Sequence, residues 1–333
     1  MRVERERAEA VATAAFEAHA ITPTDAATTA AVLVSADARG KQSHGLLRLP
    51  RFVRGIEHGN VDPDGDIAVV RDSGAAATVS GGSRLGPVVA REAVGEATAR
   101  ADDHGIGAVG VHDSNHLGML GYYTDVIRQA GYVGIAVTNT EPAMPPYGGA
   151  ESILGTNPIA IGIPSDPAFN LDMSTSSIAR GTVLRAKENG DQLPEGVALD
   201  ADGAPTRDPE AALNGVIRPF GGAKGSGLAI AVEILAGGLV GAAMGSDVTG
   251  TYHTEDECTK GDLFLAIDPE ALGGSGFVAR VNEFVAELKA GDTAAGFDEV
   301  RLPGESSTAA ADAETVTVDD DVWTEVLAMA NQG

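Results

Sequence analysis

Two neighbouring stretches decide the fold class: residues 131–140, which read GYVGIAVTNT, and residues 157–165, which read NPIAIGIPS. Each contains a short apolar run without an alternating polar face, which is typical of strands covered on both sides. We expect strands there over residues 133–139 and 158–164, and further strands over residues 107–111, 169–173 and 263–267. Helical periodicity is found over residues 85–100, 122–130 and 226–243. The sequence therefore predicts an α/β body.

The residues before about 75 read as helical instead. Thr22, Pro23 and Asp25 supply an N-cap, a first-turn proline and an early acid for a helix that ends at Gly40. A second helix is predicted over residues 44–59, with Pro50 tolerated near its start, and residues 319–331 read as a capped amphipathic helix. We therefore expect a helical domain of residues 1–74, onto which residues 306–333 pack back, and an α/β domain of residues 75–305.

Two segments of the predicted α/β domain stand out. Residues 187–214 are rich in Gly, Pro and acidic residues, which predicts an irregular excursion or a lid. Residues 228–244 are apolar, but they contain Glu233 and three glycines and are too short to cross a bilayer. We interpret this second segment as a buried helix.

The charge of the chain is strongly one-sided. The 333 residues include 48 Asp and Glu against 23 Lys and Arg, which gives a net charge of −25. Nucleic acids and anionic membranes bind clustered cations, so this composition argues against both as partners. The carboxylates are dispersed over the whole length, a pattern that favours a salt-adapted protein over an ordinary acidic enzyme.

The single cysteine and the start of the chain indicate a compartment. Cys258 cannot form an internal disulfide, and it lacks a second cysteine for a zinc site. The opening residues MRVERERAEA lack the apolar core of a signal peptide. We therefore expect a cytoplasmic protein.

Several motifs predict little chemistry. Gly105, Gly107 and Gly110 fit G-x-G-x-x-G, but a helix precedes them and a strand follows, the reverse of a Rossmann fingerprint. The run HTEDEC at residues 253–258 lacks the spacing of a metal site, and no metal is expected. Ser43 beside His44 suggests a hydrolase, although no G-x-S-x-G elbow is present.

Three clusters are better candidates for a site. His44 and Arg48 lie four residues apart, so one helical face would present a proton donor and a carboxylate-binding guanidinium, or simply a solvated face. Residues 113–116, which end in His116, follow a predicted strand and would line a crevice or form a turn. Lys224 and Gly225, just before an apolar helix, would bind an anion or form an exposed turn.

Six blocks together resemble the malate/L-lactate dehydrogenase type 2 family, which also includes sulfolactate and ureidoglycolate dehydrogenases and cyclic imine-carboxylate reductases. They are spread over most of the length of the chain and follow the family's order: SHGLLRLPRFVRGIEHG (43–59), NHLGMLGYY (115–123), LGTNPIAIGIP (154–164), LDMSTSSIARG (171–181), PFGGAKGSGLA (219–229) and RLPGE (301–305). The resemblance implies a non-Rossmann α/β cofactor domain with a mixed sheet, a helical substrate and dimer domain, and an active site between them. It also implies a homodimer that uses NAD or NADP, of which we favour NAD.

The resemblance also implies roles for individual residues. His44 is similar to the family's acid/base, Arg48 to its carboxylate clamp, His116 to a second polar group at the reacting centre, and Ser43 to a support for His44. The implied cofactor contacts are Leu117, Gly118, Gly121, Asp172, Met173, Ser174, Lys224, Gly225, Arg301, Leu302, Pro303 and Gly304. The implied substrate contacts, besides Arg48, are Thr156, Arg180 and Gly181.

The resemblance predicts hydride transfer between NAD(P)H and a 2-keto or (S)-2-hydroxy acid, with malate or lactate favoured. The alternatives are a sulfolactate or ureidoglycolate dehydrogenase, a hydrolase that uses Ser43, and a non-catalytic relative that only binds the cofactor. Two residues depart from relatives: Phe52 replaces a frequent Tyr, and Thr182 replaces the Asp of the imine reductases. The second departure argues against the imine-reductase branch.

Overall fold

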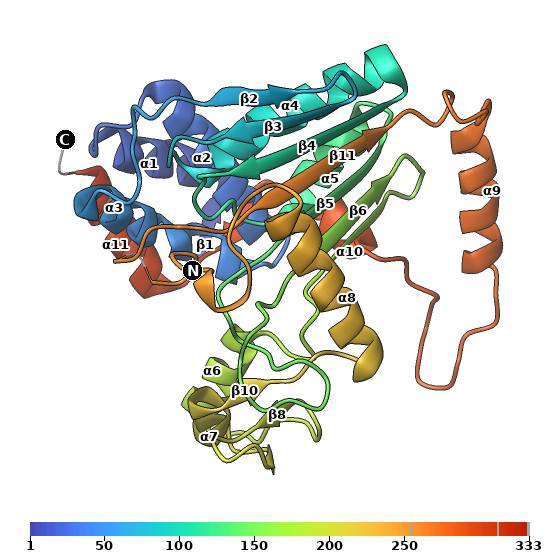
Figure 1. The fold of residues 1–333 in the computed structure, drawn as a ribbon. Coiled ribbons are helices and arrows are strands. Elements are labelled where there is room, and N and C mark those ends of the chain that lie inside the picture. The colour runs from blue at the N-terminus through green and yellow to red at the C-terminus, as the bar shows by residue number, and fades with distance from the viewer. Residues whose placement is uncertain (254, 312, 332–333) are drawn as a thin grey trace.

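A seven-stranded mixed sheet forms the centre of the molecule in this computed structural model, which describes residues 1–253, 255–311 and 313–331 (Figure 1). Its order is β2-β3-β4-β11-β5-β6-β7, and β3 and β4 are its parallel pair. The bounds are β2 Ala68–Asp72, β3 Ala76–Ser80, β4 Ile106–His112, β5 Val133–Thr138, β6 Ile159–Ile163, β7 Phe169–Met173 and β11 Asp262–Ile267. The five predicted strands are confirmed as β4, β5, β6, β7 and β11, and the expected mixed α/β sheet with them.

The middle position of the sheet is taken by a strand from late in the chain. β11 pairs antiparallel with both β4 and β5, so that Phe264 lies opposite Val109 on one side and Ala136 on the other. These three side chains are fully buried. The insertion explains why strands 4 and 5, adjacent in the sequence, are not neighbours in the sheet.

Two helices, α4 (Gly86–His104) and α5 (Leu120–Gln129), pack against the sheet. Gly105 ends α4 in the left-handed conformation with φ +78°, while Gly107 and Gly110 lie within β4. A side chain at Gly107 would place its Cβ 1.9 Å from the Ala97 carbonyl oxygen, so this glycine lets α4 approach the strand. These glycines serve the helix end and its packing, which confirms that they are not a Rossmann fingerprint.

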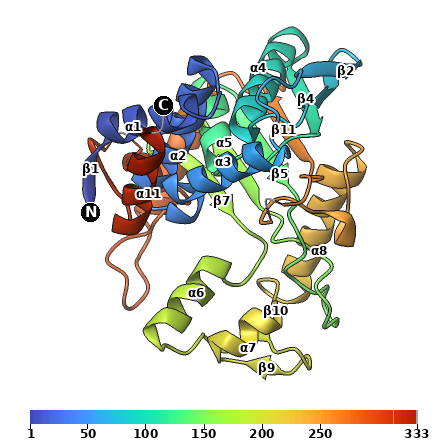
Figure 2. The same ribbon diagram turned by 90° about the vertical axis from the view of Figure 1, so that its left-hand side faces the viewer.

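Both ends of the chain build one helical layer beside the sheet (Figure 2). Its helices are α1 (Arg5–Glu17), α2 (Pro23–Ala38), α3 (Leu49–His58) and α11 (Asp320–Ala330). Strand β1 (Arg2–Glu4) pairs with β12 (Thr315–Thr317), and Phe16, Leu33, Phe52 and Trp323 share one core. The tail thus packs on the N-terminal region, whereas the domain boundaries at residues 74 and 305 stay predictions. Strand β2 of the central sheet lies before the first of them.

Two helix predictions need correction. Residues 44–59 are not one helix: two 3₁₀ turns, Gln42–His44 and Leu46–Arg48, precede α3, because Gly45 is extended (φ −89°, ψ −150°). The helix predicted over residues 226–243 is instead α8 (Ala223–Glu233) followed by a π-helical turn, Ile234–Gly238. The observed helical segment begins three residues before the predicted start and ends five residues before the predicted end. The predicted burial is confirmed for one face only: Val232 and Ala236 lie in a hydrophobic core, whereas Ile234 is 54% and Leu239 65% exposed.

The predicted irregular excursion is also wrong, because residues 187–214 belong to a small folded lobe. It contains α6 (Arg180–Asn189), α7 (Pro209–Asn214) and the three-stranded sheet β8 (Ala198–Leu199), β9 (Pro205–Thr206) and β10 (Val216–Ile217). Val183, Leu193 and Ile217 are buried in its core. Figures 1 and 2 both show this lobe below the sheet.

The sequence patterns also missed strands β1, β2, β3 and β12, the 3₁₀ turn Gly245–Asp247, helix α9 (Phe277–Lys289) and helix α10 (Glu305–Ala309). Helix α9 buries Val285 and leaves Phe284 exposed. None of the helices in the described part of the chain is long and apolar enough to cross a membrane.

Candidate active site

A cavity of about 300 Å³ gathers most of the predicted site residues from distant parts of the chain. The predicted residues that line it are Ser43, His44, Arg48, His116, Leu117, Gly118, Thr156, Asp172, Met173, Ser174, Arg180 and Gly181. Lining residues that sequence reasoning missed include Lys41, Thr140, Ser176, Thr251 and Lys260.

The remaining predicted residues do not line this cavity. The Gly121 N–H lies next to it and donates to Oδ2 of Asp172 at 3.1 Å. Residues 301–304 run beside β7, where the Pro303 carbonyl accepts from the Asn170 N–H at 3.1 Å. Lys224 is exposed in the first turn of α8, and Gly225 is buried against Phe220. The predicted cofactor roles of these residues stay predictions.

Two tight turns bring the proposed acid/base and the carboxylate clamp together. The Arg48 Nε donates to the Ser43 carbonyl at 2.7 Å, and the Ser43 hydroxyl lies 3.0 Å from Nδ1 of His44. Because that contact occupies Nδ1, proton exchange with a substrate falls to Nε2. The His116 ring lies 5.8 Å from the His44 ring, centre to centre. The predicted pair therefore meets at one cavity, although not through a single helix.

Asp37 anchors these turns from the last turn of α2. Its Oδ2 accepts the Leu46 N–H at 2.9 Å, between His44 and Arg48 in the sequence. A Cβ at Gly45 would lie 1.9 Å from Oδ1 of Asp37, so the carboxylate lies directly against the glycine. Burial raises the pKa of Asp37 to about 7, and the Leu46 hydrogen bond opposes that shift. Sequence reasoning missed this residue, because no motif in α2 marks it and its role depends on a contact outside the helix.

The electrostatic setting keeps both imidazoles neutral at neutral pH. Burial, with the nearby Arg48 and Lys41 charges, lowers the pKa of His44 to about 3. Burial and the Arg48 charge likewise lower the pKa of His116 well below its usual value. Burial and the Arg51 charge lower the pKa of Arg48 to about 10, which leaves the guanidinium charged. The cavity thus offers a fixed cation beside two neutral imidazoles.

A buried ion pair closes one wall of the cavity. Lys260 Nζ lies 2.5 Å from Oδ2 of Asp262, and both side chains are almost fully buried. The other carboxylate oxygen of Asp262 has no hydrogen-bond partner in the described structure.

Neither the cysteine nor a cluster of ligands indicates a metal site in the part of the chain that the structure describes. Burial raises the pKa of Cys258 to about 11, so this residue is a neutral thiol at neutral pH. Among the described residues, no three His, Cys, Asp or Glu side chains gather as metal ligands would, and Thr254 of the HTEDEC run lies outside them.

The floor of the cavity suits an anionic cofactor group. Residues 117–120 line it and lead into α5, whose N-cap residue, Met119, makes no side-chain cap hydrogen bond. A helix N-terminus carries unpaired N–H groups and partial positive charge, which favour a phosphate. Asp172 takes the Gly121 N–H of this turn, and burial raises the pKa of its carboxyl. The residues present therefore fit the diphosphate of a dinucleotide.

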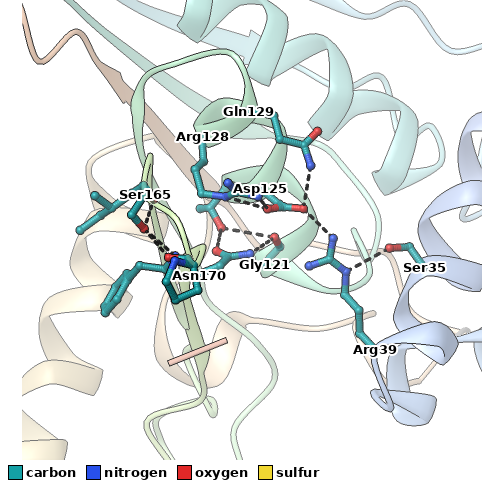
Figure 3. Close-up of polar contacts among 12 residues, drawn as sticks. Ser35, Arg39, Gly121, Asp125, Arg128, Gln129, Ser165 and Asn170 are labelled. Carbon is teal, nitrogen blue, oxygen red and sulfur yellow. Dashed lines mark hydrogen bonds and ion pairs between the residues drawn. The ribbon is translucent and has the colours of Figure 1, made fainter. Parts of the chain in front are cut away.

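Figure 3 shows how Arg39, at the end of α2, is docked onto α5. Arg39, just after α2, pairs with Asp125 of α5 at 2.6 Å, and Arg128 pairs with the other oxygen of that carboxylate at 2.5 Å. Asn170 of β7 donates to the Gly121 carbonyl at 2.7 Å. These contacts fix α2, α5 and β7, the elements that carry opposite walls of the cavity, relative to one another.

Comparison with known proteins identifies relatives of this chain. The family model for malate/L-lactate dehydrogenase matches residues 3–327. The chain is 45% identical, over 90% of its length and 88% of the relative's, to the L-sulfolactate dehydrogenase of Methanothermobacter thermautotrophicus. It is 47% identical, over 78% of both chains, to the malate/(S)-sulfolactate dehydrogenase of Methanothermus fervidus.

Two further matches extend the comparison. The (2R)-3-sulfolactate dehydrogenase (NADP(+)) of Chromohalobacter salexigens is 38% identical, over 89% of this chain and 88% of the relative. The structure of sulfolactate dehydrogenase from Methanocaldococcus jannaschii superimposes with a TM-score of 0.95 at 40% identity, over 100% of this chain and 97% of that one. The fold and the site thus define a dehydrogenase of the NAD(P)-dependent 2-hydroxy acid class. The chain belongs to the malate/L-lactate dehydrogenase family.

Proposed function

We propose that this enzyme interconverts a 2-keto acid and the corresponding 2-hydroxy acid, and that its substrate carries a second acidic group. Sulfopyruvate and sulfolactate are the preferred pair, and oxaloacetate and malate follow. This order corrects the preference for malate or lactate drawn from the sequence, because the relatives named above are sulfolactate dehydrogenases or act on both acids. The observation that carries the proposal is the convergence of His44, Arg48 and His116 on one cavity.

The side chains have complementary roles in this proposal. The Arg48 guanidinium binds the substrate carboxylate as a planar fork, and its bond to the Ser43 carbonyl holds that fork in place. Neutral His44 accepts the hydroxyl proton during oxidation and returns it to the keto oxygen during reduction. His116 stabilises the charge that develops on that oxygen. Thr156, Arg180 and Gly181 lie on the substrate side.

A nicotinamide dinucleotide supplies or accepts the hydride when it is bound. Leu117 and Gly118 would line its diphosphate site at the start of α5, next to Gly121, whose own N–H is donated to Asp172, and residues 172–174 would lie on the opposite wall. We retain NAD as the favoured cofactor, with NADP as the alternative. We also retain a cytoplasmic location, consistent with the buried free thiol of Cys258.

A substrate panel tests the proposal directly. Sulfopyruvate, oxaloacetate, pyruvate and the keto form of ureidoglycolate are each offered with NADH and with NADPH, and cofactor absorbance is followed. We expect the highest kcat/KM with sulfopyruvate, and a loss of several hundredfold or more in His44→Ala. Ester or amide turnover without a nicotinamide, or cofactor binding without oxidation by any keto acid, would contradict the proposal.

We further propose that the enzyme is a homodimer in which a second copy covers the apolar face of α8. Ile230, Ile234, Leu235 and Leu239 are exposed along this helix and the turn after it. A contiguous apolar face of this kind marks an interaction surface. Light scattering should show a dimer for the wild type and a monomer for Ile234→Glu/Leu239→Glu, whereas Leu272→Glu, on a different exposed segment, should stay dimeric. A monomeric wild type would contradict the proposal.

A further inference from the structure

A second, smaller chamber opens beside the active-site cavity. Its volume is about 30 Å³, and it shares Arg48, His116 and Thr251 with the larger cavity. Its other walls come from α3, from residues 60 and 61, from Asn115 and from the loop around residue 250. A space of this size holds one or two water molecules or a single small polar group. It therefore suits the end of a short substrate rather than a long chain.

Arg51 lines this chamber but not the larger cavity. It lies on α3, three residues after Arg48, so the two guanidinium groups share one face of the helix turn. Its guanidinium stacks over the Tyr252 ring at 4.5 Å, and Nη1 donates a long hydrogen bond of 3.4 Å to the Tyr252 carbonyl. This stacking leaves the planar fork oriented while most of its five N–H donors remain for a ligand.

The charges around the chamber favour an anion. Arg51 and Arg48 lie close enough for the charge of one to lower the pKa of the other, and the Arg51 charge also lowers the pKa of His116. Two adjacent guanidinium groups repel one another unless anionic groups lie between them. Asp256 lines the chamber as well, but its side chain is exposed at the rim. An anionic ligand at each guanidinium would relieve the repulsion.

We propose that Arg51 binds the distal anionic group, sulfonate or carboxylate, of a dianionic 2-keto acid whose own carboxylate is held by Arg48. This inference rests on the proposed function and assigns it a specificity-determining residue. The substrate spans the two chambers at His116, with its keto oxygen toward His44. A planar fork matches the two-oxygen face of either anion, and the small chamber excludes bulkier distal groups.

The test compares dianionic with monoanionic substrates in matched variants. In Arg51→Gln we expect kcat/KM to fall tenfold to a hundredfold for sulfopyruvate and oxaloacetate, and by less than about threefold for pyruvate and 2-oxobutyrate. Arg51→Lys should recover part of the loss, since it keeps the charge without the fork. The control is Arg54→Gln on the same helix, where an exposed guanidinium donates to the Pro50 carbonyl, and it should change neither class.

The outcomes separate this inference from the proposed function. Equal losses for dianionic and monoanionic substrates in Arg51→Gln would overturn the role of Arg51 and leave the dehydrogenase assignment intact. A wild type that reduces no keto acid would instead remove the proposed function. If Arg51→Gln does not fold, inhibition of the wild type decides: sulfoacetate should bind at least tenfold more tightly than propionate, and equal inhibition would overturn the inference.

Discussion

The protonation state of His44 is decided by its surroundings in the free enzyme. Burial and the charges of Arg48 and Lys41 lower its pKa to about 3, so the imidazole is unprotonated at neutral pH and has a free acceptor nitrogen. We expect no titration of His44 between about pH 5 and about pH 8 when its imidazole is followed by NMR. Arg48→Gln should raise that pKa, because it removes the charge with the larger of the two effects. A midpoint near the ordinary histidine value in the wild type would contradict this prediction.

Asp37 gives the stability of the enzyme a definite pH dependence. Its pKa is about 7 in the folded protein and 3.8 as the ordinary value, so the folded state holds the proton more tightly. The stability that this proton contributes is present at low pH and is lost as the pH rises from about 4 to about 7. The slope is at most about 1.4 kcal/mol per pH unit.

Asp37→Asn tests this linkage, because the amide is neutral at every pH and keeps an acceptor for the Leu46 N–H. Urea unfolding at several pH values should show the variant gaining stability relative to the wild type as the pH rises through this window. If the free energy of unfolding of the wild type and of Asp37→Asn changed in parallel with pH, Asp37 would not titrate in the folded protein over this range.

Candidate site residues could be predicted where they lie only a few positions apart in the sequence. His44 and Arg48 could be paired by spacing, although the helix assumed for them does not form because Gly45 is extended. Lys260 and Asp37 could not be found in this way. Their roles depend on contacts with Asp262 and Leu46 inside a folded core, and spacing does not report burial.

At the level of elements, the contact between α2 and α5 determines how the turns that carry His44 and Arg48 lie over the start of α5. Asp125 of α5 lies between Arg39 and Arg128, and the side chains of Arg39 and Asp125 are 5% and 4% exposed (Figure 3). Removing one partner from such a pair leaves a buried charge without compensation.

We therefore expect Asp125→Asn to lower the free energy of unfolding by about 3–5 kcal/mol, measured by chemical denaturation. The matched control is Glu210→Gln, which breaks the exposed Lys187–Glu210 pair and should cost less than about 1 kcal/mol. Similar effects of the two substitutions would show that the buried pair does not hold α2 on α5.

Elements were predictable in proportion to how fully they are buried. β5 and β6 were found because apolar residues cover both of their faces, whereas most of the edge strand β2 is exposed and its polar residues hide the pattern. β1 and β12 stabilise each other across almost the whole chain, and no local signal reports such a pairing. The residues of α8 and the turn after it are apolar almost throughout, which led to a prediction of burial. One face of this segment, with Ile230 and Ile234, is nevertheless exposed.

For the whole molecule, the net charge of −25 is the dominant long-range term. Dispersed carboxylates repel one another over about 10 Å at 0.1 M salt and over only about 3 Å at 1 M. We expect the melting temperature and the half-life of activity to rise between about 0.1 M and about 2 M KCl, as in a salt-adapted enzyme. In a variant with several exposed Glu changed to Gln, the melting temperature should rise less over the same increase in salt. Equal melting temperatures of the wild type at both salt concentrations would contradict this expectation.

The position of β11 affects how the protein can fold while it is being synthesised on the ribosome. The slot between β4 and β5 stays empty until residues 262–267 have been synthesised and have left the exit tunnel. Until then the nascent chain exposes two unpaired edges in the middle of its future sheet, which invites association with other unfinished chains. The sheet of this enzyme can therefore close only after β11 has emerged, and its assembly depends on whatever shields those edges until then.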